Sequence, residues 1–75
     1  MKIELEVLAD KLQQLEYELL VDWGLRRISG GFVHLSYVSH DDKYIYLTCR
    51  SGVQSDVDND VTEEEMRMDC NYNLI

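Results

Sequence analysis

The feature that most constrains the fold is a row of leucines near the start of the chain. Five leucines are separated by three, four, three and four residues: Leu5, Leu8, Leu12, Leu15 and Leu19. This spacing places side chains on one face of an α-helix. Gly24 follows as a helix stop, and the segment is rich in Leu, Glu, Gln and Lys, which favour helices. The pattern predicts a helix from Ile3 to Trp23.

This helix carries more apolar residues than one face requires. The additional ones are Val7, Tyr17, Leu20, Val21 and Trp23. A helix that covers a sheet normally keeps its far face polar. Two interpretations follow: the last two turns are buried broadly, or they contact another protein.

Two strand-like segments come next. Residues 32–38 (FVHLSYV) and 44–49 (YIYLTC) are rich in aromatic and β-branched residues. The polar, turn-prone residues 39–43 separate them, which predicts a β-hairpin.

The end of the chain alternates between apolar and polar residues from Met66 to Leu74. Alternation with a period of two is typical of a half-buried strand. Residues 51–65 are then the connection, with one helical turn near residues 62–65, where TxxE allows a capping box. The predicted fold class is α+β: one N-terminal helix packed on a three-stranded antiparallel sheet, in the order α-β-β-β, as a single domain over residues 1–75.

Alternation also assigns the two faces of the predicted hairpin. The face expected to pack on the leucines holds Val33, Leu35, Tyr37, Ile45, Leu47 and Cys49. The opposite face holds Phe32, His34, Val38, Tyr44 and Tyr46. A cluster of aromatic residues on a sheet face indicates burial or an interface. Three interpretations remain: residues 51–65 cover it, a second copy of the chain covers it, or a different protein binds there.

The net charge of −8 is concentrated towards the end of the chain. Residues 51–75 hold seven acids and one base. Such a charge repels nucleic acid and anionic lipid, whose binding depends on Lys and Arg, and it attracts basic surfaces. The expected partner-binding acids are Asp56, Asp58, Asp60, Glu63, Glu64 and Glu65. If they lie beside the acids of the helix, the two sets form one negative patch.

The alternating aspartates do not make a calcium loop. If Asp56 takes the first position, the sixth is Val61 rather than the required Gly, and the twelfth is Arg67 rather than Glu. The two cysteines and two histidines lack the spacing of zinc ligands. We therefore expect no metal and no cofactor; the alternative left open is a weak divalent-ion site in this acidic segment.

Catalytic chemistry is not expected either. His34 and Cys49 fall on opposite faces of the predicted sheet, so they do not form a nucleophile–base pair. None of the GxSxG, GxxxxGK[ST] and HExxH motifs occurs. Cys49 and Cys70 are expected to be reduced, buried thiols.

These observations predict a small acidic protein without enzymatic activity that binds another protein with a basic surface. One version is an inhibitor that mimics nucleic acid and occupies the groove of a nucleic-acid-binding protein, as a phage-type anti-defence protein does. The residues expected to supply affinity are Trp23, Tyr44, Tyr46 and Arg50, because interface hot spots favour these types. The rival hypothesis is a homodimeric structural or regulatory module whose charge serves solubility.

The expected location follows from the opening segment. It carries Glu4, Glu6 and Asp10 instead of a basic start and an unbroken apolar run, so no secretory signal is expected. We expect a cytoplasmic protein, in the host cytoplasm if it is viral, that contacts neither membrane nor nucleic acid directly.

Overall fold

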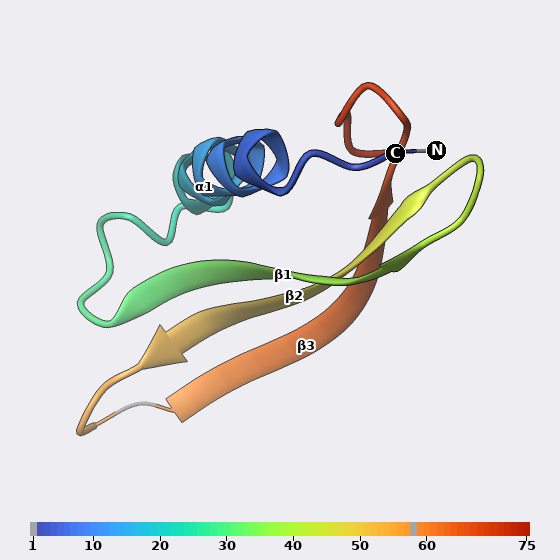
Figure 1. Ribbon diagram of the computed structural model, residues 1–75. Helices are drawn as coiled ribbons and strands as arrows, with labels where there is room; N and C mark the ends of the chain where they lie inside the picture. Colours follow the sequence, from blue (N-terminus) through green and yellow to red (C-terminus); the bar gives the residue numbers. More distant parts are fainter. Residues whose placement is uncertain (1, 58) are drawn as a thin grey trace.

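The computed structural model describes residues 2–57 and 59–75 (Figure 1). Its elements are α1 (Leu5–Asp22), β1 (Gly31–His40), β2 (Ile45–Gln54) and β3 (Asn59–Met68). The three strands form one antiparallel sheet in the order β1-β2-β3. The predicted α+β fold, with one helix packed on this sheet in the order α-β-β-β, is confirmed.

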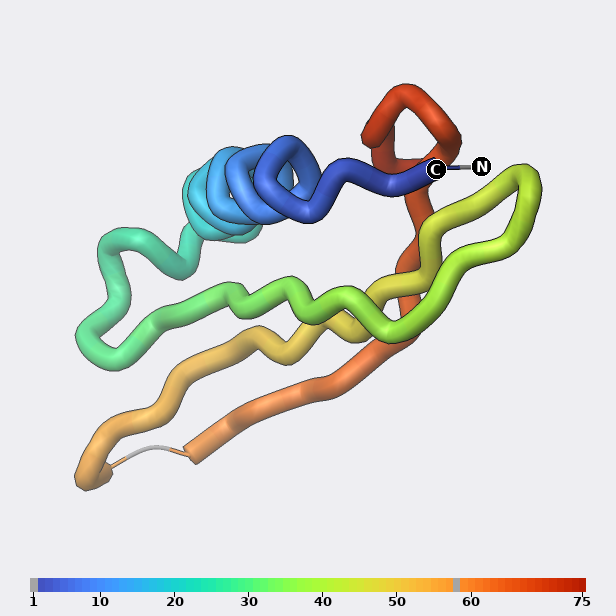
Figure 2. The backbone as a smooth tube through the Cα atoms, viewed as in Figure 1, coloured from blue at the N-terminus to red at the C-terminus, as the bar shows by residue number. Residues whose placement is uncertain are grey.

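The helix lies within two residues of its predicted bounds. It starts at Leu5 without a side-chain cap, and at its end the N–H of Trp23 donates to the carbonyl of Leu19. Gly24 then has a φ of 71°, a left-handed conformation that glycine adopts without strain. Figure 2 follows the chain from there through a turn into β1.

The core lies between α1 and one face of the sheet. It contains Leu8, Leu12, Leu15, Leu35, Ile45, Leu47, Cys49 and Met68. The leucine stripe is therefore buried from Leu8 onward, whereas Leu5 is 69% exposed. The predicted core rows of the first two strands are confirmed at Leu35, Ile45, Leu47 and Cys49, while Tyr37 remains 39% exposed.

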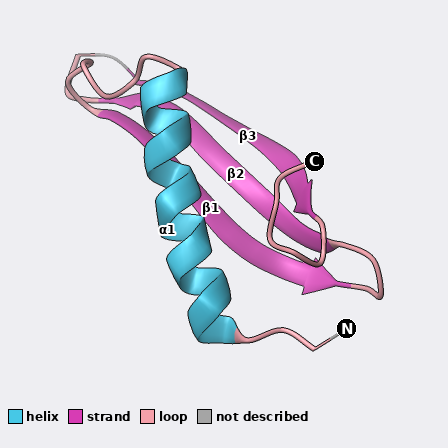
Figure 3. Cartoon of the chain, turned by 90° about the horizontal axis from the view of Figure 1, so that it is seen from above, coloured by secondary structure: helices cyan, strands magenta, loops and turns pink. Residues whose placement is uncertain are grey.

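The helix covers only part of the molecule. It packs directly along β1, the strand at one edge of the sheet, as the view from above shows (Figure 3). The opposite face of the sheet is covered by no described segment of the chain (Figure 1). The fold is thus a two-layer arrangement with one face of the sheet left open.

The first hairpin contains a β-bulge. The register shifts between Tyr37 and Ser39, so Val38 is the extra residue and is 59% exposed. At the turn, the Asp41 carboxylate accepts hydrogen bonds from the backbone N–H groups of Lys43 and Tyr44, both at 2.8 Å. This side-chain-to-backbone turn fixes where β2 begins.

The predicted third strand was placed too late in the chain. β3 spans Asn59–Met68 and pairs with a β2 that extends to Gln54. Residues 51–65 are therefore mostly strand: they include no helical turn at 62–65 and do not cover the aromatic face. Gly52, at φ 136°, faces β3 so closely that an added Cβ would lie 2.0 Å from the Asp60 carbonyl oxygen, which explains the glycine here.

After β3 the chain turns instead of continuing as a strand. The Asp69 carboxylate accepts hydrogen bonds from the N–H groups of Asn71 and Asn73 at 2.8 and 3.0 Å. Tyr72 and Leu74 then pack against the core. Met66, Met68, Tyr72 and Leu74 are thus at least partly buried as predicted, whereas Cys70 is exposed. A turn, not a continued strand, brings Tyr72 and Leu74 to the core.

No helix among the described residues combines the length and the apolar character that a membrane crossing requires.

Candidate protein-binding surface

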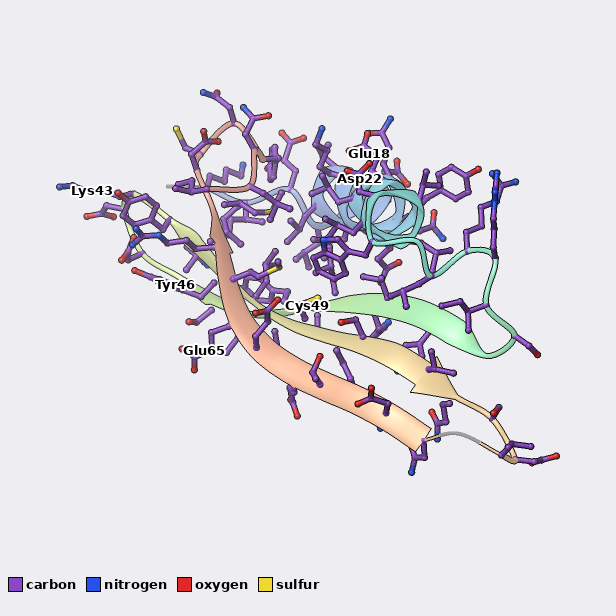
Figure 4. The ribbon with its side chains drawn as sticks, turned by 180° about the vertical axis from the view of Figure 1, so that it is seen from behind. Glu18, Asp22, Lys43, Tyr46, Cys49 and Glu65 are labelled. Atoms are coloured by element: carbon purple, nitrogen blue, oxygen red, sulfur yellow. The ribbon has the colours of Figure 1, made fainter. Side chains whose placement is uncertain are left out.

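The uncovered side of the sheet, called here the open face, is defined by the strand register. Its strand residues are Phe32, His34, Ser36, Ser39, Tyr46, Thr48, Arg50, Gly52, Gln54, Asn59, Val61, Glu63, Glu65 and Arg67. Figure 4 shows Tyr46 and Glu65 on the side away from the helix and Cys49 on the side towards it. The open face therefore combines half-buried aromatic side chains with charges of both signs.

Tyr46 and Tyr44, the residue directly before β2, form an aromatic pair on this side of the sheet. Their ring centroids are 6.5 Å apart, and the Arg67 guanidinium lies over the Tyr44 ring, 4.6 Å from its centroid. The Tyr46 hydroxyl donates a 2.5 Å hydrogen bond to the carboxylate of Asp41. Contacts from two strands and a turn thus hold both tyrosines in place, which lowers the entropy they lose on binding a partner.

The hydrogen bond between Tyr46 and Asp41 shifts the pKa values of both side chains. Donation by Tyr46, followed by the N–H bonds of Lys43 and Tyr44, lowers the pKa of Asp41 from 3.8 to about 2. The bond to Asp41 raises the pKa of Tyr46 above its ordinary value of 10.0. At neutral pH this corner therefore holds a fixed negative charge next to a neutral phenol.

The three consecutive glutamates of β3 divide between the two sides of the sheet. In the strand register, Glu63 lies opposite Arg50 and Glu65 opposite Thr48 on the open face. Glu64 lies opposite Cys49 on the helix side. All three side chains are exposed. Among the described residues, no cation comes within ion-pair distance of their carboxylates. Three unneutralised charges therefore line one edge of the sheet.

The predicted combination of helix and β3 acids into one patch does not form. The helix packs along β1, and β3 lies beyond β2 at the other edge of the sheet. Glu64 and Glu16 are both near enough to act on Cys49, whose pKa is raised mainly by burial and further by these two charges. The acids of the β3 edge therefore form a surface separate from the exposed acids of the helix.

The other predicted residues lie away from the tyrosines. Arg50 is exposed near the middle of the open face, and Trp23 is 41% exposed at the C-terminal end of α1. Asp56 lies in the β2–β3 turn and Asp60 is exposed near the start of β3. Asp58 lies outside the described residues. Of the four predicted hot-spot residues, the fold brings only the two tyrosines together.

The last two turns of the helix are not broadly buried. Tyr17 is 52% and Val21 44% exposed, and the Arg26 guanidinium stacks 5.3 Å from the centroid of the Tyr17 ring. This removes the first of the two interpretations. Contact with another protein remains a prediction for these two turns of the helix.

Sequence reasoning missed Asp41 and Arg67 as residues that organise the surface. The signal for Asp41 was present, since aspartate at the start of a short turn commonly accepts nearby N–H groups. No such signal marked Arg67, because the residue moves over Tyr44 only when β3 pairs with β2 in the observed register.

Among the described residues, the histidines and cysteines lie apart from one another. His40 Nδ1 and the Tyr37 hydroxyl form a 2.6 Å hydrogen bond, and His34 Nδ1 lies 3.3 Å from the Glu16 carboxylate. His34 and Cys49 face opposite sides of the sheet. Cys49 is buried as predicted, but Cys70 is exposed, because it sits in the turn after β3. Within residues 2–57 and 59–75, no three His, Cys, Asp or Glu side chains converge as metal ligands.

Comparison of the chain with protein-family models, curated proteins and solved structures found no match.

Proposed function

We propose that this chain is a non-enzymatic protein-binding protein that docks its acidic β3 edge and open face on a basic surface of another protein. The observation that carries the proposal is the uncovered sheet: half-buried tyrosines lie on a face that no described segment covers, beside three exposed and unpaired glutamates. Exposed aromatic surface next to charge is typical of protein interfaces.

Charge and aromatic surface have different roles in this proposal. Unscreened carboxylates accelerate the encounter with a cationic partner. The pre-positioned rings of Tyr44 and Tyr46 supply apolar contact once the partner has docked. Arg50, on the same face as Tyr46, is available to pair with an acid of the partner.

One version of this function is nucleic-acid mimicry. Successive residues of a strand rise about 3.4 Å, and each strand of a DNA duplex carries one charge per about 3.4 Å of axis. Glu63–Glu65 therefore repeat charge along β3 at a density comparable to one DNA strand, although they alternate between its sides. A partner that binds nucleic acid through a basic groove fits this version.

A matched pair of variants tests the proposal. In the first, Asp56, Asp60, Glu63, Glu64 and Glu65 become Asn or Gln; in the second, the same change is made at five exposed acids of the helix side, Glu4, Glu6, Asp10, Glu18 and Asp22. Both variants lose the same net charge. Each is immobilised, proteins from a host lysate are captured, and the retained proteins are identified.

The expected result is that basic proteins bind the wild-type chain and the helix-side variant, elute as salt rises, and do not bind the β3-side variant. For the mimicry version, the captured protein should bind nucleic acid, and the wild-type chain should displace it. If the two variants bind the same proteins equally well, charge on β3 has no specific role and the proposal is wrong.

The rival function, self-association through the open face, rests on the half-buried Phe32, Tyr44 and Tyr46. It predicts a mass near twice 8.8 kDa in sedimentation, reduced to a single chain by Tyr46→Glu. A mass of one chain at all accessible concentrations would remove this rival.

A further inference from the structure

We propose that the outer edge of β3, from Val61 to Glu65, binds an extended segment of the partner that bears lysine or arginine, as a fourth strand of the sheet. This inference rests on the proposed function and names the chemistry of the segment that is recognised. An edge strand with free N–H and C=O groups is the usual receptor for such strand addition.

The register shows which backbone groups of β3 are free. The N–H of Leu35 points away from β2, because it donates to Glu16. Leu35 and Cys49 are therefore a non-hydrogen-bonded pair, and the backbone groups of Cys49 point the other way, towards β3. Cys49 and its β3 partner Glu64 are then a hydrogen-bonded pair, and such pairs alternate with non-hydrogen-bonded ones along the strand. The backbone groups of Glu63 and Glu65 therefore point outward.

The chain's own tail supports this assignment. Arg67 follows Glu65 by two residues, so its backbone groups also point outward. Its carbonyl accepts a hydrogen bond from the N–H of Ile75 at 3.1 Å, which shows that this edge can take up an additional segment of chain. Leu74 also forms an isolated bridge with Met68. The tail occupies one end of the edge and leaves Val61–Glu65 open. At the β1 edge, α1 packs alongside the strand and the outward N–H of Leu35 already donates to Glu16.

Charge selects the occupant of this edge. A second copy pairing antiparallel through β3 would place glutamates opposite glutamates, which is destabilising. A segment with basic side chains at alternate positions would instead face Glu63 and Glu65 on the open face, and its remaining residues would point towards the side of Glu64. The unpaired carboxylates thus oppose self-pairing and favour a cationic strand.

A shallow hollow at this edge offers room for one long side chain. It is lined by Tyr46, Glu64, Glu65, Met66, Arg67 and Ile75. Met66 and Ile75 contribute apolar surface, and the two glutamates outnumber the one cation, Arg67, whose guanidinium lies over the Tyr44 ring. This combination suits the aliphatic stem and cationic end of lysine or arginine.

The probe for the test is a short peptide of alternating lysine and threonine, titrated into the isotopically labelled full chain at low ionic strength. Two further peptides carry N-methyl groups on all lysine amides or on all threonine amides. In an added strand only one of these two sets faces β3. We expect one methylated peptide to bind about tenfold more weakly, the effect of losing one or two net hydrogen bonds, and the other to bind as the unmodified peptide does.

Amide hydrogen exchange supplies the second measurement. Peptide binding should slow exchange at Glu63 and Glu65, whose N–H groups face outward, and leave Glu64 unchanged because it already bonds to β2. Glu63→Gln and Glu63→Pro form the matched variants. Both lose the same charge, but only proline removes the outward N–H, which an edge strand tolerates, so Glu63→Pro should weaken binding further.

The experiments distinguish a failure of the strand-addition inference from a failure of the proposed function. If both methylated peptides bind like the unmodified one and exchange at Glu63 and Glu65 does not slow, basic ligands bind without strand addition; this inference is then overturned while the proposed function stands. If the unmodified peptide does not bind, the inference also fails, and the paired charge variants decide the proposed function separately.

Discussion

The Glu16 carboxylate of α1 accepts a 2.7 Å hydrogen bond from the backbone N–H of Leu35 in β1. This contact joins the helix to the edge strand it covers and satisfies a donor that the ladder with β2 leaves free. His34, the preceding residue, places Nδ1 3.3 Å from the same carboxylate. One helical side chain thus both positions the helix and occupies an outward donor at one edge of the sheet.

Replacing Glu16 by alanine should lower the free energy of unfolding by about 1–2 kcal/mol, because it leaves the Leu35 N–H without its charged acceptor. Glu16→Gln should lose less, since the amide oxygen can still accept. Urea denaturation monitored by circular dichroism measures both, with the exposed Glu18→Ala as the control. Equal stability of the Glu16→Ala and Glu18→Ala variants would contradict this role.

Leu8 and Leu5 belong to the same sequence stripe but differ in burial, at 2% and 69% exposed. Leu8→Ala should therefore cost about 2–5 kcal/mol through the cavity it leaves. Leu5→Ala should stay within about 0.5 kcal/mol of the wild-type chain, as expected for a surface position. Thermal or urea unfolding of the two variants distinguishes them, and similar losses would show that the helix starts its buried face at Leu5.

The Asp41–Tyr46 contact predicts a pH dependence. Hydrogen bonds from Tyr46 and from the N–H groups of Lys43 and Tyr44 lower the pKa of Asp41 from 3.8 to about 2. The stabilisation is complete above pH 3.8 and is lost as the pH falls through about 2. An NMR titration of the Asp41 carboxyl carbon should show this midpoint, and Tyr46→Phe should raise it. A midpoint near the ordinary value, unmoved by Tyr46→Phe, would refute the contact.

The two cysteines should differ in reactivity. Cys70 is exposed and Cys49 is buried, and burial together with the charge of Glu64 raises the pKa of the Cys49 thiol, which disfavours the reactive thiolate. A thiol reagent should modify Cys70 alone in the folded chain and both residues in denaturant. Mass spectrometry of the digested protein measures this, and early modification of Cys49 would indicate that the core opens.

The sequence was most informative where structure is local. Helix spacing predicted α1 to within two residues, and alternation predicted that Leu35, Ile45, Leu47 and Cys49 face the core. The aromatic face was also predicted to contain Tyr44 and Tyr46. These features depend on the order of neighbouring residues, because the periods of a helix and a strand are properties of the backbone.

The third strand was predicted less well. Its alternating signal began at Met66, near the end of the observed β3, and the glutamates before it resembled a solvated connection. Glutamate has little intrinsic preference for strands, and strand preference depends strongly on context. Residues 59–65 become a strand because β2 supplies hydrogen-bonding partners along its whole length, and that pairing is not encoded within the segment itself.

The sequence by itself thus determined which residues are helical, which faces are apolar and how strongly negative the chain is. Tertiary structure decided that the acids of β3 line a strand edge away from the helix, that Arg67 reaches Tyr44, and that the Glu16 carboxylate accepts a hydrogen bond from Leu35 at the β1 edge. The physical reason is that each of these contacts joins residues from different elements, so their distances are fixed only when the sheet has acquired its register and the helix has packed on β1.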